Sequence, residues 1–262
     1  MVLRAEPIGD GYFLFKTVGL IEVMAKTIKN FFKAQSRKRK LQRYLKKLPS
    51  VFPGVNWQPF HEVTQYFHEK SLSTLDDQTL LYRMASRTPA NGIAVEIGSW
   101  IGHSTSLIGL ALRGPEARCY AVDAFSAMTE DDTEKDNFKS FLKRLKTPLS
   151  QRALFDQHIE KYGLSKRVVP IPFASAEAIQ HLPVKANSVD FLYIDGGHTL
   201  DVVRKDISLY LPLVKTGGIV CFHDFNSYYF PDVTTAVWEE ARKGAFAQFL
   251  ELRSTTLALV KS

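Results

Sequence analysis

Residues 95–104 read Val-Glu-Ile-Gly-Ser-Trp-Ile-Gly-His-Ser, and this stretch decides the fold. The apolar run at 93–97 suits a buried strand of a parallel sheet, and residues 104–112 repeat apolar side chains at helical spacing. Between them, Gly98 lets the backbone turn and approach a ligand closely, while Gly102 lets the helix start pack on the strand. The stretch therefore predicts a strand, a tight turn and a helix that together bind a nucleotide-like ligand.

The turn matches neither of the two common phosphate-binding patterns. A dinucleotide-binding turn has Gly-x-Gly-x-x-Gly and a P-loop has Gly-Lys-Ser/Thr, whereas here the acidic Glu96 stands at the carboxyl end of the strand. The pattern Glu96-x-Gly98-x-x-x-Gly102 resembles the first motif of class I S-adenosylmethionine-dependent methyltransferases. This resemblance implies that the cofactor S-adenosylmethionine lies on the turn. It places the following residues at the cofactor: Glu96, Gly98, Ser99, Trp100, Gly102 and Ser104.

Two more predicted strands supply further cofactor contacts under this resemblance. Residues 119–123 form an apolar strand that ends in Asp123, where the family's acidic residue accepts hydrogen bonds from both ribose hydroxyls. Residues 168–173 predict a third strand, and Ser175 and Ala176 after it resemble the loop on the adenine side. Alternatively, Ser175 is a plain helix N-cap.

The fourth and fifth predicted strands, at 189–195 and 217–224, also end in carboxylates. In open α/β sheets, ligands bind beyond the carboxyl ends of the strands. Four acidic residues fall at such ends, which predicts one site at that edge of the sheet: Glu96, Asp123, Asp195 and Asp224.

Two motifs late in the sequence point to one branch of the methyltransferase family. Residues 193–199, Tyr-Ile-Asp-Gly-Gly-His-Thr, and residues 222–224, Phe-His-Asp, resemble the branch containing macrolide-sugar and aminocoumarin-sugar O-methyltransferases and the cephalosporin-biosynthesis methyltransferase-like protein. The likeness covers roughly residues 75–260. It implies an α/β, Rossmann-like fold: a seven-stranded, mostly parallel sheet with helices on both faces. The last two strands, 246–252 and 256–261, would form an antiparallel hairpin at the sheet edge.

The chemistry of methyl transfer suggests roles for the late motifs. Transfer from a sulfonium to a hydroxyl is an in-line displacement, so the oxygen must be positioned and its proton removed. A divalent cation of the Mg or Mn type, held by Asp195 and Asp224, would serve both needs. In the relatives the third ligand, adjacent to the second, is acidic or an amide. Here that neighbour is His223, whose imidazole suits manganese, iron or zinc better than magnesium; the alternatives for His223 are a base or a buried structural histidine.

His198 is the predicted general base. It follows Asp195 by three residues, the offset at which the related catechol enzyme carries its lysine base. Histidine titrates near about pH 6.5, so a neutral ring can accept a proton at neutral pH. The alternative is a residue whose ring caps the turn before a helix. With Asp195, His198 completes the predicted catalytic pair.

These motifs predict methyl transfer to a hydroxyl of a small molecule, sugar or glycoconjugate, with the acceptor resting on family likeness alone. The alternative is a non-catalytic, methyltransferase-like module that binds a partner or nucleic acid through its basic arm. Nucleic-acid base modification is disfavoured, because the Asn/Asp-Pro-Pro-Tyr/Phe strand end of such enzymes is replaced here by Asp-Gly-Gly-His. Cys119 and Cys221 fall inside predicted strands, which favours free buried thiols and a cytoplasmic protein. The charged segment 125–167 is expected to be helical and either covers the substrate pocket or is solvated.

The N-terminal 50 residues form a distinct basic arm. They hold 12 Lys and Arg against 3 Asp and Glu, whereas the rest of the 262-residue chain holds 22 against 24. We therefore expect a basic amphipathic extension, 1–50, before a methyltransferase domain, 51–262. A helical apolar stripe is predicted from Leu14 onward, with Pro49 ending the helix. Its residues are Leu14, Val18, Ile21, Ala25, Ile28 and Phe32.

Three interpretations of the arm remain open. It packs on the core or on a second subunit of a homo-oligomer, it lies on an anionic membrane surface, or it contacts nucleic acid. Lys16 and Glu22 interrupt the apolar stretch too early for a membrane span of about 20 residues. The positive charge follows the apolar part, unlike the order in a cleaved signal peptide.

Overall fold

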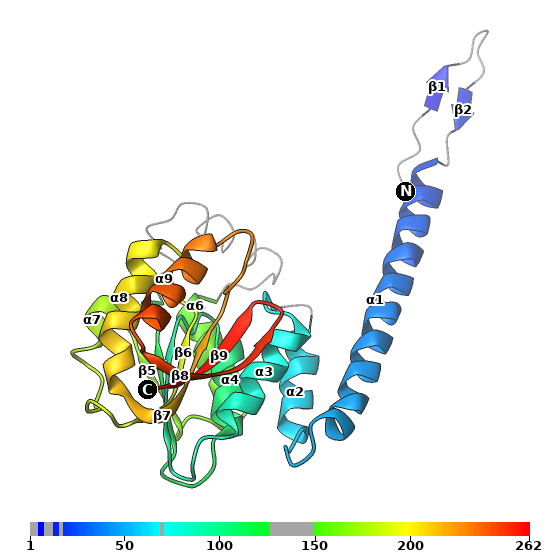
Figure 1. The fold of residues 1–262 in the computed structure, drawn as a ribbon. Helices are drawn as coiled ribbons and strands as arrows, with labels where there is room; N and C mark the ends of the chain where they lie inside the picture. The colour runs from blue at the N-terminus through cyan, green and yellow to red at the C-terminus, as the bar shows by residue number, and fades with distance from the viewer. Residues whose placement is uncertain (1–4, 8–12, 16–17, 69–70, 126–148) are drawn as a thin grey trace. The chain divides into compact units, whose positions relative to one another are not determined.

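The computed structural model describes residues 5–7, 13–15, 18–68, 71–125 and 149–262 (Figure 1). The chain is divided into two compact units, Met1–Gly54 and Val55–Ser262. The first contains the antiparallel strands β1 (Ala5–Pro7) and β2 (Phe13–Phe15), and the helix α1 (Val18–Val51). None of the helices in these described ranges is long and apolar enough to cross a membrane.

The second unit is built around one sheet. Its elements in chain order are α2 (Gln58–Phe67), α3 (Leu75–Ala85), β3 (Ile93–Ile97), α4 (His103–Ala111), β4 (Arg118–Val122), α6 (Gln151–Lys161), β5 (Val168–Ile171), α7 (Ser175–Ala178), β6 (Val189–Ile194), α8 (Leu200–Tyr210), the 3₁₀ turn Leu211–Leu213, β7 (Val214–Phe222), α9 (Pro231–Arg242), β8 (Phe246–Arg253) and β9 (Thr256–Lys261).

The sheet has seven strands in the order β5-β4-β3-β6-β7-β9-β8. Strands β3 to β7 are parallel, β9 runs antiparallel to β7, and β8 and β9 form the antiparallel hairpin at the edge. The predicted α/β fold, with its mostly parallel sheet and C-terminal hairpin, is confirmed. The order reverses between β3 and β6, which makes their carboxyl ends the expected ligand-binding edge.

Helices cover both faces of this sheet (Figure 1). On one face lie α7, α8 and α9, and their apolar residues join those of β3, β4, β6 and β7 in one buried cluster. On the other face, α4 packs between α2, α3 and α6. All six residues of the central strand β6 are buried, as expected of a strand that is covered on both sides. Cys119 and Cys221 are free and buried in β4 and β7, as predicted.

The turn after β3 requires glycine at position 98 for two reasons. Gly98 has φ of +88°, the left-handed region that other residues avoid. A Cβ at this position would also lie 1.9 Å from the carbonyl oxygen of Asp195. The structure shows a close approach between the ends of β3 and β6, and the approach of Gly98 to a ligand stays a prediction. Gly102 likewise faces α6 and not the strand, because a Cβ there would meet Phe155 at 3.1 Å.

Two predictions for the arm are wrong. Leu14, the first residue of the predicted helical stripe, lies in β2, because an apolar run as short as Phe13–Phe15 satisfies a strand as well as a helix. Pro49 lies inside α1, which continues to Val51. Proline removes one hydrogen-bond donor and disfavours further helix, but in the last turn the helix tolerates this loss and ends two residues after Pro49. In the predicted segment 125–167, α6 is helical, while residues 126–148 fall outside the described residues.

Replacing Gly98 by alanine is expected to destabilise the protein by at least about 3 kcal/mol, because the new Cβ adds a backbone clash to an unfavourable positive φ. Urea unfolding followed by circular dichroism measures this loss. The matched control is Gly217→Ala, where φ is +80° but nothing lies within 4 Å of the added Cβ. The control should cost only about 1–2 kcal/mol; equal losses would contradict the proposed close approach.

Candidate active site

The carboxyl ends of four parallel strands stop at one level. The strands pair in register there, with Ile97 opposite both Val122 and Ile194, and Ile194 opposite Phe222. The residue after each strand continues the row by donating its backbone N–H to the neighbouring strand: Gly98 to Val122 at 2.9 Å, Asp195 to Ile97 at 2.9 Å and His223 to Ile194 at 3.0 Å. The structure thus brings the predicted site residues of β3, β4, β6 and β7 to one edge.

Glu96 lies beneath the turn and is fully buried. Its carboxylate accepts a hydrogen bond from the Thr105 hydroxyl at the start of α4. Burial raises the pKa of Glu96 to about 7, against the lowering effect of side-chain hydrogen bonds from Ser104 and Thr105. The predicted cofactor residues Glu96 and Ser104 are therefore linked to each other. Because Glu96 has no exposed surface, its role in the turn is structural support from the buried side.

Asp123 holds the other side of the turn. Its carboxylate accepts backbone hydrogen bonds from Trp100 and Phe125, each at 2.7 Å, and one from the Gln151 amide at 3.0 Å. Burial raises the pKa of Asp123, and these hydrogen bonds oppose the rise. Trp100 itself has φ of +45°, so the turn is bent at both Gly98 and Trp100. Gln151, on α6, carried no sequence signal, because its distance along the chain from Asp123 depends on the fold.

Three chemically active side chains gather beyond β6 and β7. Donor atoms of Asp195, His198 and Asp224 lie within 4.8 Å of one another, a spacing compatible with a metal ion. His198 Nε2 is 3.1 Å from Asp224 Oδ2, and the His198 ring stacks on Phe230 with centroids 3.9 Å apart. Burial alone would raise the pKa of Asp224, but hydrogen bonds from His198 and His223 lower it well below its usual value. The cluster is therefore a coupled carboxylate and imidazole site.

His223 joins this cluster from the sheet side. Its Nδ1 lies 2.9 Å from Asp224 Oδ2 and 3.2 Å from Asp195 Oδ1. Burial lowers the pKa of His223, but these two carboxylates outweigh burial and raise it well above its usual value. In this arrangement the ring bridges the two carboxylates. The group of donor atoms close enough to share a metal ion consists of Asp195, His198 and Asp224 and does not include His223. Metal binding by His223 therefore stays a prediction.

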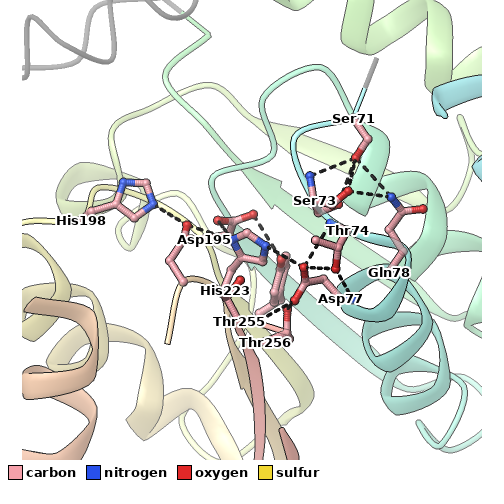
Figure 2. Close-up of polar contacts among 12 residues, drawn as sticks. Ser71, Ser73, Thr74, Asp77, Gln78, Asp195, His198, His223, Thr255 and Thr256 are labelled. Atoms are coloured by element: carbon pink, nitrogen blue, oxygen red, sulfur yellow. Dashed lines mark hydrogen bonds and ion pairs between the residues drawn. The ribbon is translucent and has the colours of Figure 1, made fainter. Parts of the chain in front are cut away.

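Figure 2 shows that the polar contacts continue from His198, Asp195 and His223 to Asp77 on α3. Asp77 Oδ2 lies 4.0 Å from His223 Nε2. The Asp77 carboxylate also accepts hydrogen bonds from the Thr74 backbone and hydroxyl, the Thr255 backbone and the Thr256 hydroxyl. Sequence reasoning missed this residue. The spacing Thr74-x-x-Asp77 signals a helix cap, but no local pattern links it to β7 or β9.

The predicted adenine-side residues lie apart from this cluster, at the start of α7. Ser175 is the first residue of that helix and Ala174 is its N-cap, so Ser175 as the N-cap is wrong by one position. The Ser175 carbonyl accepts a hydrogen bond from Tyr210 at 2.6 Å. Burial raises the pKa of Asp206 on α8 to about 6. Ser175 and Ala176 are both partly buried, and their contact with a cofactor stays a prediction.

A family model described as a methyltransferase domain matches residues 95–225. The chain belongs to this methyltransferase family. The matched region runs from the first strand of the parallel sheet to the end of β7 and contains Glu96, Asp123, Asp195 and Asp224. The predicted class I S-adenosylmethionine-dependent methyltransferase is thereby confirmed.

Solved structures share the methyltransferase fold at low identity. The O-methyltransferase NovP has a TM-score of 0.57 and 17% identity, over 86% of this chain and 99% of that one. An O-methyltransferase from Bacillus cereus, solved in complex with SAH, has a TM-score of 0.54 and 15% identity, over 82% and 96%. A protein from Clostridium thermocellum described as an rRNA methylase has a TM-score of 0.52 and 13% identity, over 72% and 98%. Such likeness shows the fold and leaves the acceptor open.

The sequence is also similar to one uncharacterised curated protein from Acanthamoeba polyphaga mimivirus. The two are 35% identical over 82 residues, which is 31% of this chain. The chain thus matches about a third, 33%, of that relative's length.

Stability should fall between about pH 4.5 and about pH 7 because of Glu96. The folded-state pKa of about 7 exceeds the ordinary glutamate pKa of 4.5, so within this window only the folded state keeps the proton. Rising pH then favours the unfolded state, by an amount on the order of 3 kcal/mol. Glu96→Gln should flatten this decline in urea unfolding, whereas the exposed Glu116→Gln should leave it unchanged. A wild-type slope in Glu96→Gln would show that Glu96 does not cause the decline.

Proposed function

We propose that this methyltransferase transfers a methyl group from S-adenosylmethionine to a hydroxyl group. The proposed acceptor is a sugar or a glycosylated small molecule. The observation that carries the proposal is the grouping of Asp195, His198 and Asp224 at the ligand-binding edge of the sheet. A hydroxyl must lose its proton during transfer, and this cluster offers both carboxylates and an imidazole for that step.

The turn residues fit the cofactor. Asp123 stands at the end of β4 with its carboxylate oriented by the Trp100 and Phe125 backbone, which suits hydrogen bonds from ribose hydroxyls. A carboxylate has about four acceptor sites, and three hydrogen bonds already reach Asp123. Two ribose hydroxyls would therefore share the carboxylate with Gln151 or displace its amide. Gly98, Ser99 and Trp100 would line the methionine part of the cofactor.

His198 would take the proton from the acceptor hydroxyl. The 3.1 Å contact between Nε2 and Asp224 Oδ2 and the stacking on Phe230 hold its ring in one orientation. Asp195 and Asp224 would hold a divalent cation, with His223 as a nitrogen ligand. A bound cation would supply Lewis acidity that favours the alkoxide form of the acceptor.

The loop after β7 supports a ring-shaped acceptor. Tyr228 and Tyr229 are 92% and 81% exposed, and they precede Phe230, which stacks on His198. Their rings pack edge to face with centroids 5.6 Å apart. Exposed tyrosines beside a reactive group offer apolar faces together with hydroxyl donors, and a sugar ring presents both kinds of surface. This aromatic pair is the feature that favours a glycosidic acceptor over a small alcohol.

Calorimetry is expected to show binding of S-adenosylhomocysteine to the purified protein. Asp123→Ala should weaken it about 100-fold, because two charge-assisted hydrogen bonds to ribose are lost. The exposed Asp201→Ala is the matched control and should bind normally. Absence of binding to the wild type would remove the cofactor from the proposal, and normal binding by Asp123→Ala would remove only the ribose contact.

His198→Ala should lower turnover about 10²- to 10⁴-fold while leaving the affinity for Mn²⁺ intact, because its proposed role is proton removal. Asp195→Asn and Asp224→Asn should lose Mn²⁺ affinity, measured by calorimetry without substrate. His223→Ala reports whether the second histidine is a ligand. A parallel loss of Mn²⁺ affinity in His198→Ala would make His198 a ligand and refute the base role. Turnover that survives chelator treatment would refute cation assistance.

A further inference from the structure

Helix α1 carries two apolar stripes on opposite sides. The first occupies positions Ile21, Ala25, Ile28 and Phe32 of the sequence, and the second occupies Leu41, Leu45 and Leu48. Both follow helical steps of three and four residues. Leu41 lies nine positions after Phe32 in the sequence. At 3.6 residues per turn, nine positions correspond to about two and a half helical turns. The two stripes therefore face about half a turn apart.

The described residues of the two stripes differ in solvent exposure. Leu41, Leu45 and Leu48 are buried, whereas Phe32 is 66% exposed. A helix that needed only to pack on its own chain would keep one continuous stripe, because a single face can then be covered along its whole length. The change of face divides α1 into a C-terminal part with buried leucines and an N-terminal part in which the described apolar ring, that of Phe32, is exposed.

Basic residues flank the first stripe. Lys26, Lys29 and Lys33 are exposed and lie one helical turn apart, on a face next to that of Phe32. The exposed run Arg37-Lys38-Arg39-Lys40 begins four residues after Lys33. Together these account for seven of the 12 basic residues in the first 50. An apolar stripe beside a cationic face is the pattern of helices that lie in the plane of a membrane interface.

We propose that the N-terminal part of α1, residues 18–40, docks on an anionic membrane surface. The stripe would enter the boundary between headgroups and acyl chains, and the flanking Lys and Arg would meet lipid phosphates and carboxylates. An RNA partner would use the same cations but would leave Phe32 and its stripe without a role, since phosphate contacts need no apolar face. Docking would bring the methyltransferase unit to acceptors that are themselves held at a membrane.

The test is co-sedimentation of the full-length protein with phosphatidylcholine vesicles, with and without phosphatidylserine. Pelleting is expected only with phosphatidylserine and should weaken as salt is raised. A variant carrying Lys26→Glu, Lys29→Glu and Lys33→Glu should lose at least about 100-fold in partitioning. The matched control, Lys166→Glu, Lys185→Glu and Lys205→Glu, makes the same change in net charge at exposed positions of the second unit and should pellet normally.

A second variant separates the membrane from other partners. Ile28→Gln with Phe32→Gln keeps the net charge, so it should weaken vesicle binding at least about 10-fold while leaving any RNA binding unchanged. Thermal unfolding at the wild-type temperature would confirm that each variant folds. Equal pelleting of the two lysine variants would overturn the proposal. So would a wild-type dimer that Phe32→Gln converts to monomer, because the stripe would then be a subunit interface.

Discussion

The site depends on four parallel strands that end in register. Backbone hydrogen bonds tie the first residue beyond β3, β6 and β7 to the end of a neighbouring strand. Gly98 makes this level row possible, since any side chain there would overlap the Asp195 carbonyl. Side chains that are far apart in the sequence thus emerge side by side, and a small shift of one strand would separate the cofactor turn from the cluster at Asp195.

The buried carboxylates on the two sides of this row of strand ends differ in their ionisation. Below the turn, Glu96 is isolated from water, so burial raises its pKa towards neutrality and favours the uncharged form. At the Asp195 cluster, carboxylates alternate with imidazoles, which keeps Asp224 ionised despite its burial. The first arrangement suits a structural support for a loop. The second concentrates groups that can exchange protons or hold a cation, and these are the properties that methyl transfer to a hydroxyl requires.

The contacts beneath the cluster connect it to the edge of the sheet. Asp77 caps α3, binds the start of β9 through Thr255 and Thr256, and faces His223 (Figure 2). One buried carboxylate therefore joins a helix, the C-terminal hairpin and the strand that carries His223. The C-terminal hairpin is thereby connected to the site, because Thr255 in its turn and Thr256 at the start of β9 orient the carboxylate that faces His223.

Local patterns were enough to predict the strands and the acidic residues at their ends, Glu96, Asp123, Asp195 and Asp224, because apolar periodicity and glycine placement are local properties. The arrangement of these strands in one sheet with a C-terminal hairpin followed from the family resemblance. Local patterns failed where two structures suit the same residues, as with Leu14 in β2.

The contacts of each site residue depend on how the chain folds in three dimensions. The tertiary structure placed His198 against Asp224 and Phe230, turned His223 between two carboxylates, and brought in Gln151 and Asp77 from distant helices. Except for the neighbours His223 and Asp224, these contacts join residues of separate segments of the chain. Side-chain packing and the register of the strands select them, and no local pattern in the sequence pairs the partners.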